Sequence, residues 1–184
     1  IYPDQGDVYP DENDAEHVYA NPERAAERAM HYVEQGFTAL KFDPAGAYTV
    51  FDGGMPTGSE LARSEAFMRT LREAVGGDVD LLFGTHGQFT PAGAIRLAQR
   101  IAPYDPLWLE EPVPPENAAE MAVVARATSI PVATGERLCT KYEFARVLEE
   151  GAAKRSVFGI SAKSCNPSPI ASISSRFLAL KKDW

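Results

Sequence analysis

Cysteine is scarce in this sequence of 184 residues, which holds only Cys139 and Cys165. The two do not form a CxxC pair, so the sequence favours a reducing, cytoplasmic setting over a disulfide scaffold or a zinc site. Basic residues are also few, with 18 Lys and Arg against 26 Asp and Glu and a net charge of -8. Such an acidic chain is a poor match for a phosphate backbone, which argues against nucleic acid as a partner.

Long apolar runs are missing as well. No stretch approaches the roughly 18 apolar residues that a membrane helix needs. The start, IYPD at residues 1–4, has neither a basic nor an apolar region, so it does not resemble a signal peptide. It also lacks an initiator Met, and we expect the sequence to begin inside a longer protein. With 45% hydrophobic residues the composition is that of a globular protein.

Strand and helix patterns alternate along the chain. Apolar periodicity and cap residues predict helices at 22–35, 59–75, 90–101, from 115, and 141–149, with strands at 37–42, 79–83, 107–109 and 130–133. Ser59 is the expected cap of the second helix, and Pro115-Glu116 the expected start of the fourth. Near-continuous apolar strands with short connections predict parallel strands buried on both faces. An open doubly wound sheet and a β/α-barrel both fit, although no GxGxxG supports a dinucleotide fold.

Polar residues follow each predicted strand. In a β/α-barrel they would meet at the C-terminal face, where such enzymes carry out chemistry. Glu110 and Glu136 lie 26 residues apart, which is one strand-helix unit. Two carboxylates at neighbouring strand ends would repel one another, and a bound Mg²⁺ would relieve that repulsion. The alternative is that each pairs with a nearby Arg or caps the next helix.

His86 and Lys41 are the candidate catalytic residues. His86 lies in GTHGQ (residues 84–88), where flanking glycines allow a sharp turn that exposes the imidazole as an acid or base. Its alternative role is to pack the loop. Lys41 faces inward if Leu40 and Phe42 pack against helices, and would then bind substrate or stabilise charge. The alternative for Lys41 is an ion pair with Asp43 or Glu136.

Four motifs then resemble the enolase superfamily. They are LKFDP (residues 40–44), THGQFT (85–90), WLEEP (108–112) and ATGERL (133–138). They are most similar to the mandelate racemase/muconate lactonizing enzyme family, near its galactonate dehydratases and anhydrogalactonate cycloisomerases. The resemblance covers about residues 1–153.

The resemblance implies part of a (β/α)₇β barrel whose capping domain lies outside this sequence. It implies Mg²⁺ held by Glu110 and Glu136, with His86 protonating a departing hydroxyl and Lys41 assisting. Asp43 and Arg137 are the implied substrate-binding residues. The expected activity is that of a sugar-acid dehydratase or cycloisomerase that removes the proton α to a carboxylate. The intact enzyme is expected to be a homo-oligomer that binds neither nucleic acid nor membrane.

Three features depart from the family pattern. Gly84 stands where a third acidic metal ligand is normal, so His86 or a shifted group would have to complete the site. Asp43 replaces the second Lys of the racemase branch, which makes a racemase or epimerase the weaker alternative. The family's other catalytic His has no counterpart before the chain ends. A non-catalytic barrel remnant or binding module is therefore the second alternative, and we expect this chain alone to be inactive.

The last part of the sequence differs in composition. Residues 156–184 contain seven serines, whereas residues 1–155 contain three. We interpret 1–155 as a partial β/α-barrel domain and 156–184 as an atypical tail, either out of frame or a truncated sixth unit. An open partial barrel exposes strand edges, so we expect poor solubility or self-association.

Overall fold

The computed structural model describes residues 21–43 and 53–153, and these form alternating helices and strands. The predicted tail at 156–184, the segment before residue 21 and the rest of the loop after residue 43 lie outside the described residues. The elements are, in chain order, α1 (Pro22–Glu34), β1 (Ala39–Phe42), α2 (Gly58–Val75), β2 (Asp80–Gly84), α3 (Pro91–Ile101), a 3-10 turn (Ala102–Tyr104), β3 (Trp108–Glu110), α4 (Ala118–Ala127), β4 (Val132–Ala133) and α5 (Lys141–Glu149).

The helix starts follow from local side-chain chemistry. Asn21 and Thr90 cap α1 and α3, each directly before a proline. The predicted cap of α2 was wrong: Thr57, not Ser59, accepts the Glu60 backbone N–H, and the Glu60 carboxylate accepts the N–H of Thr57 in return. The start of the fourth helix was also placed too early, because Asn117 caps α4 through the backbone N–H of Glu120.

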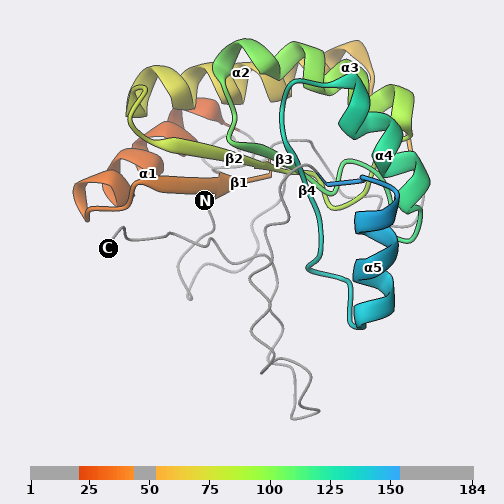
Figure 1. Ribbon diagram of the computed structural model, residues 1–184. Helices are drawn as coiled ribbons and strands as arrows, with labels where there is room; N and C mark the ends of the chain where they lie inside the picture. The colour runs from red at the N-terminus through yellow and green to blue at the C-terminus, as the bar shows by residue number, and fades with distance from the viewer. Residues whose placement is uncertain (1–20, 44–52, 154–184) are drawn as a thin grey trace, which may run out of the picture.

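The four strands form one parallel sheet in the order β1-β2-β3-β4. Sequential order distinguishes a barrel wall from a doubly wound sheet, whose strand order reverses at a switch point. Helices α1 to α4 pack against one another in sequence along the outside of the sheet (Figure 1). The described residues therefore form an arc of a β/α-barrel, which confirms the predicted fold class.

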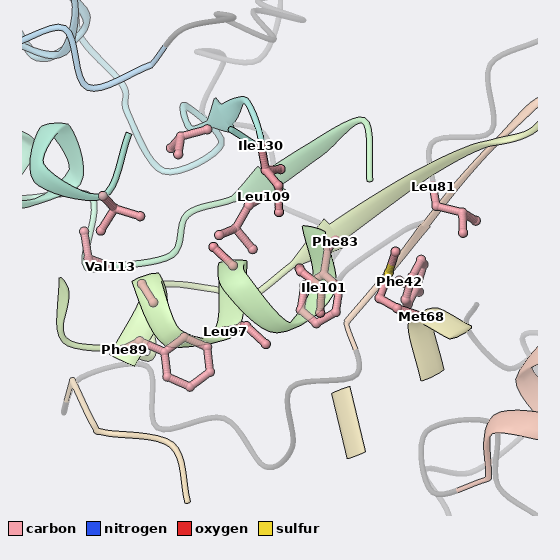
Figure 2. Close-up of a cluster of buried hydrophobic side chains, with 14 of the residues drawn as sticks. Phe42, Met68, Leu81, Phe83, Phe89, Leu97, Ile101, Leu109, Val113 and Ile130 are labelled. Carbon is pink, nitrogen blue, oxygen red and sulfur yellow. The ribbon is translucent and has the colours of Figure 1, made fainter. Parts of the chain in front are cut away.

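Most of the core lies between the strands and these helices. Strand residues that point outward, such as Leu81, Phe83 and Leu109, are fully buried against helical residues such as Met68 and Leu97 (Figure 2). The opposite, inner face of the sheet carries a separate small cluster of Ala39, Leu82, Trp108 and Ala133. Because side chains alternate along a strand, the residues next to the outward ones point into the barrel.

Among the described residues, every helix is too short or too polar to span a lipid bilayer. Because the strands are parallel, their C-terminal ends and the loops that follow them lie at one edge of the sheet. The functional candidates lie at that edge.

Candidate active site

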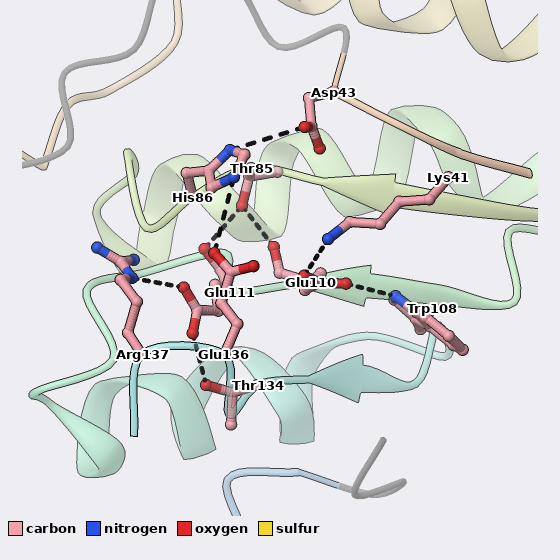
Figure 3. Close-up of polar contacts among 10 residues, drawn as sticks. All are labelled: Lys41, Asp43, Thr85, His86, Trp108, Glu110, Glu111, Thr134, Glu136 and Arg137. Atoms are coloured by element: carbon pink, nitrogen blue, oxygen red, sulfur yellow. Dashed lines mark hydrogen bonds and ion pairs between the residues drawn. The ribbon is translucent and has the colours of Figure 1, made fainter. Parts of the chain in front are cut away.

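Six side chains predicted from the sequence lie together at the C-terminal edge of the sheet (Figure 3). They come from four successive strands or from the loops that directly follow them: Lys41, Asp43, His86, Glu110, Glu136 and Arg137. The convergence of residues up to 96 positions apart is what a parallel arc of strands imposes, because all of its strands end on the same side.

Lys41 lies on the inner face, as predicted, because Leu40 and Phe42 are buried on the helical side. Its ammonium forms an ion pair with Oε1 of Glu110, while the indole Nε1 of Trp108 donates to Oε2 of the same carboxylate at 3.0 Å. The predicted alternative was an ion pair of Lys41 with Asp43 or Glu136, whereas the structure pairs Lys41 with Glu110.

Electrostatics keep this ammonium charged. Burial opposes the charged form, but attraction to Glu110, and then to Asp43 and Glu136, outweighs burial and raises the pKa of the ammonium above its usual 10.5. Lys41 is therefore a positive charge that contacts Glu110 and is attracted by two further carboxylates. It is placed to stabilise negative charge at this edge of the sheet.

His86 lies between two acids. Its backbone is left-handed, with φ of 50°, and Gly87 follows with φ of 72°. This turn directs the ring so that Nδ1 is 3.8 Å from Oδ2 of Asp43 and Nε2 is 3.7 Å from Oε1 of Glu136. A non-glycine residue in this conformation costs on the order of 1 kcal/mol, and such strain gathers at functional sites. The imidazole is about one-fifth exposed, so it can exchange a proton with a bound molecule.

Glu111 is a site residue whose role the sequence did not reveal. Its side chain is 1% exposed, and it accepts hydrogen bonds from Nε of Arg137 at 2.8 Å and from Oγ1 of Thr134 at 3.3 Å. Burial raises the pKa of Glu111 in spite of the nearby guanidinium. Its φ of 43° turns the chain after β3, so that Glu110 and Glu111 serve different partners. In the sequence, only its place in the Glu-Glu-Pro motif next to Glu110 could have indicated that Glu111 belongs to the site.

Arg137, a predicted substrate-binding residue, is held by this contact. Its Nε bonds Glu111, while its buried Nη2 has no hydrogen-bond partner among the described residues. A guanidinium anchored at one nitrogen can offer its others to a carboxylate or hydroxyl. Glu136 is more open, since its side chain is 41% exposed.

The donor set suits a hard cation, but it is not assembled as a cation cage. Within residues 21–43 and 53–153, no group of three His, Cys, Asp or Glu is placed to hold a metal ion. Glu110 instead faces Lys41, and Glu136 faces His86. Carboxylate oxygens are the ligands that Mg²⁺ prefers, and the carboxylates of Asp43, Glu110 and Glu136 all attract one buried ammonium. The chemistry of these residues therefore fits a divalent cation at this edge.

Comparison with known proteins gives consistent results. The sequence profile of the family "Enolase C-terminal domain-like" matches residues 24–162. A D-gluconate dehydratase from Thermoproteus tenax is 38% identical over 142 residues, covering 73% of this chain and 28% of the relative. The chain thus spans less than a third of that curated relative's length.

Solved structures agree with the sequence match. A mandelate racemase/muconate lactonizing enzyme-like protein from Roseovarius sp. superposes with a TM-score of 0.72 at 61% identity, covering 74% of this chain and 34% of that one. An enolase from Bradyrhizobium in complex with magnesium and mandelic acid superposes with a TM-score of 0.61 at 32% identity, covering 71% and 34%.

Proposed function

The chain belongs to the enolase C-terminal domain-like family, and from that membership we propose that it is part of a Mg²⁺-dependent sugar-acid dehydratase. One observation carries the proposal. Lys41, His86 and Glu110, together with Glu136, meet at the C-terminal edge of a parallel barrel arc. That edge is where β/α-barrel enzymes bind and convert their substrates.

The names of relatives support a sugar acid as the substrate class. They include a D-gluconate dehydratase and a D-xylonate dehydratase. A sugar acid offers a carboxylate for a cation and for Arg137, with hydroxyls for the other polar groups. The chain spans about a third of these proteins, so the activity proposed is that of a longer protein.

Glu110 and Glu136 would hold the cation. Bound Mg²⁺ would supply positive charge that makes the proton α to the substrate carboxylate more acidic. A base from outside the described residues would remove that proton from C2. Lys41, held charged by its surroundings, would stabilise the negative charge that develops on the substrate.

His86 would complete the dehydration. When the C3–O bond breaks, the imidazole would donate a proton to the departing hydroxyl, which leaves as water. The resulting enol then becomes a 2-keto-3-deoxy acid by taking up a proton at C3. Asp43 and Glu136 lie on either side of the ring, 3.8 Å from Nδ1 and 3.7 Å from Nε2, where they would orient it for this step.

A non-catalytic role is the second candidate, and one observation favours it. Glu110 is already satisfied by Lys41 and Trp108 without a cation. A barrel remnant that had lost its metal would retain such a contact. Cation binding therefore separates the two candidates.

The test has two parts. Mg²⁺ is titrated by calorimetry into the 184-residue chain and its Glu136→Gln variant, and we expect binding that the substitution abolishes. A full-length protein that carries this sequence is then incubated with D-gluconate, D-galactonate and D-xylonate, and 2-keto-3-deoxy acids are measured as semicarbazones. Absence of Mg²⁺ binding in the unsubstituted chain would favour the non-catalytic role. Binding without turnover of any acid would exclude this substrate class.

A further inference from the structure

The inner face of the sheet carries a row of positions at its C-terminal edge, and one of them has no side chain. Gly84 pairs with Glu110 in the register of β2 and β3, and Glu110 pairs with Ala133 of β4. Residues paired across adjacent strands point to the same face. A side chain at position 84 would therefore stand next to the Glu110 carboxylate.

The space that such a side chain would need is taken by Asp43. A Cβ built on Gly84 would lie 1.6 Å from Oδ1 and 2.8 Å from Cγ of Asp43, which is far inside van der Waals contact. Asp43 directly follows β1, whose last pair is Phe42 with Phe83, so it continues the row by one step. The carboxylate from the first strand thus occupies the position of a side chain on the second.

Asp43 is also deeply buried. Its side chain is 0% exposed, and a buried carboxylate costs several kcal/mol unless positive charge offsets it. Lys41 supplies some of that charge, and Nδ1 of His86 lies 3.8 Å from the Asp43 carboxylate. Complete burial also argues against the predicted role of Asp43 as a substrate-binding residue, because a sugar acid would have little access to it.

We propose that Asp43 replaces the missing acid at position 84 and completes a three-carboxylate Mg²⁺ site with Glu110 and Glu136. The ligand is exchanged between strands: β1 supplies the carboxylate, and β2 supplies the glycine that makes room for it. In this structure the Lys41 ammonium pairs with Glu110 and is attracted by the carboxylates of Asp43 and Glu136. The inference rests on the metal site of the proposed function and adds its third ligand.

The exchange can be tested by removing the carboxylate and then moving it. Mg²⁺ affinity is measured by calorimetry, and Mn²⁺ binding by electron paramagnetic resonance, on the 184-residue chain. Asp43→Asn keeps the shape and removes the charge, and we expect at least ~10-fold weaker binding, since even outer-shell partners of metal ligands contribute 10–100-fold. Asp78→Asn is the matched control, because Asp78 is exposed and precedes the opposite end of β2.

The double variant Asp43→Ala with Gly84→Asp moves the carboxylate to the second strand. Gly84 does not have a positive φ, so its backbone accepts Asp, and removal of the Asp43 carboxylate opens the space. We expect this variant to regain the binding that Asp43→Ala alone loses, while Gly84→Asp alone is destabilised by the clash. Circular dichroism establishes that each variant compared is folded.

The outcomes separate this inference from the proposed function. If Glu136→Gln loses Mg²⁺ but Asp43→Asn binds as the unsubstituted chain does, the metal site stands and the exchange is wrong. Asp43 would then serve only to orient His86. A folded double variant that binds no better than Asp43→Ala also overturns the exchange. If the unsubstituted chain binds neither cation, both proposals fail.

Discussion

Arg137 Nε donates a 2.8 Å hydrogen bond to Oε2 of Glu111, and this contact ties the loop after β4 to the loop after β3. The carboxylate is 1% exposed and the guanidinium 28% exposed, so the pair is largely shielded from solvent. The residues proposed to bind the cation lie beside this contact, because Glu110 ends β3 directly before Glu111, and Glu136 precedes Arg137 in the loop after β4. The contact therefore sets the spacing of the proposed metal ligands without supplying one.

Removing this guanidinium should destabilise the fold. Arg137→Met leaves the Glu111 carboxylate buried beside Thr134 alone, and we expect the free energy of unfolding to fall by about 3 kcal/mol. Urea denaturation measures the change. The double variant with Glu111→Gln should recover much of the loss, because no buried charge remains. A stability of Arg137→Met equal to that of the unsubstituted chain would show that the pair contributes nothing.

Gly87 should not tolerate a side chain. Its φ is 72°, and a Cβ there would lie 2.5 Å from Nη2 of Arg137 and 3.1 Å from Cα of Pro114. Gly87→Ala therefore adds displacement of Arg137 to the backbone strain. The matched control is Gly36→Ala, where φ is 90° but nothing lies within 4 Å. We expect Gly36→Ala to cost about 1–2 kcal/mol in urea denaturation and Gly87→Ala to cost more. Equal costs would contradict the predicted clash.

The start of α2 should make stability depend on pH. Hydrogen bonds from the backbone N–H and then the hydroxyl of Thr57 lower the pKa of Glu60 below 4.5. A lowered pKa in the folded state means that the unfolded chain binds the proton more readily. The stabilisation is therefore present above pH 4.5 and is lost as pH falls through the folded-state value.

Glu60→Gln isolates this effect, because Gln can make the same capping contacts without titrating. We expect the difference in stability between the unsubstituted chain and Glu60→Gln to shrink on acidification below pH 4.5. Thermal unfolding at several pH values measures this difference. Glu73→Gln, an exposed substitution in the same helix, controls for the loss of one negative charge. A difference that stays constant with pH would contradict the prediction.

Much of this arrangement could be predicted from the sequence. Apolar runs predicted the strands. Because parallel strands end on the same side of a sheet, the sequence also predicted that Lys41, His86 and Glu110 lie close together. Caps were harder where two candidates lay close together. Thr57 and Ser59 both precede an acidic turn, but only Thr57 has Glu60 three residues later, the spacing that a capping box needs.

The sequence alone could not predict that Asp43 fills the space of a side chain at position 84. The string GTHGQ shows that an acid is missing, but it does not show which distant side chain fills the space. That depends on the register of β1 against β2, because a shift of one residue would turn Asp43 to the helical side. The contact between Lys41 and Glu110, which are 69 positions apart, depends on the register of β1 against β2 and of β2 against β3.

Lys41 should compete with a cation for the same carboxylates, and Lys41→Met tests this directly. Without metal the variant leaves Glu110 with only the Trp108 indole, so we expect unfolding free energy to fall by about 2–3 kcal/mol. Mg²⁺ affinity should instead rise more than about tenfold, because an ammonium a few Å from a divalent cation repels it by several kcal/mol near a protein surface. Added Mg²⁺ should then restore the lost stability.

Lys141→Met, which removes an exposed ammonium from α5, is the control and should change neither quantity. Weaker or unchanged Mg²⁺ binding in Lys41→Met would show that the ammonium does not compete with the cation and instead helps to hold the carboxylates in place.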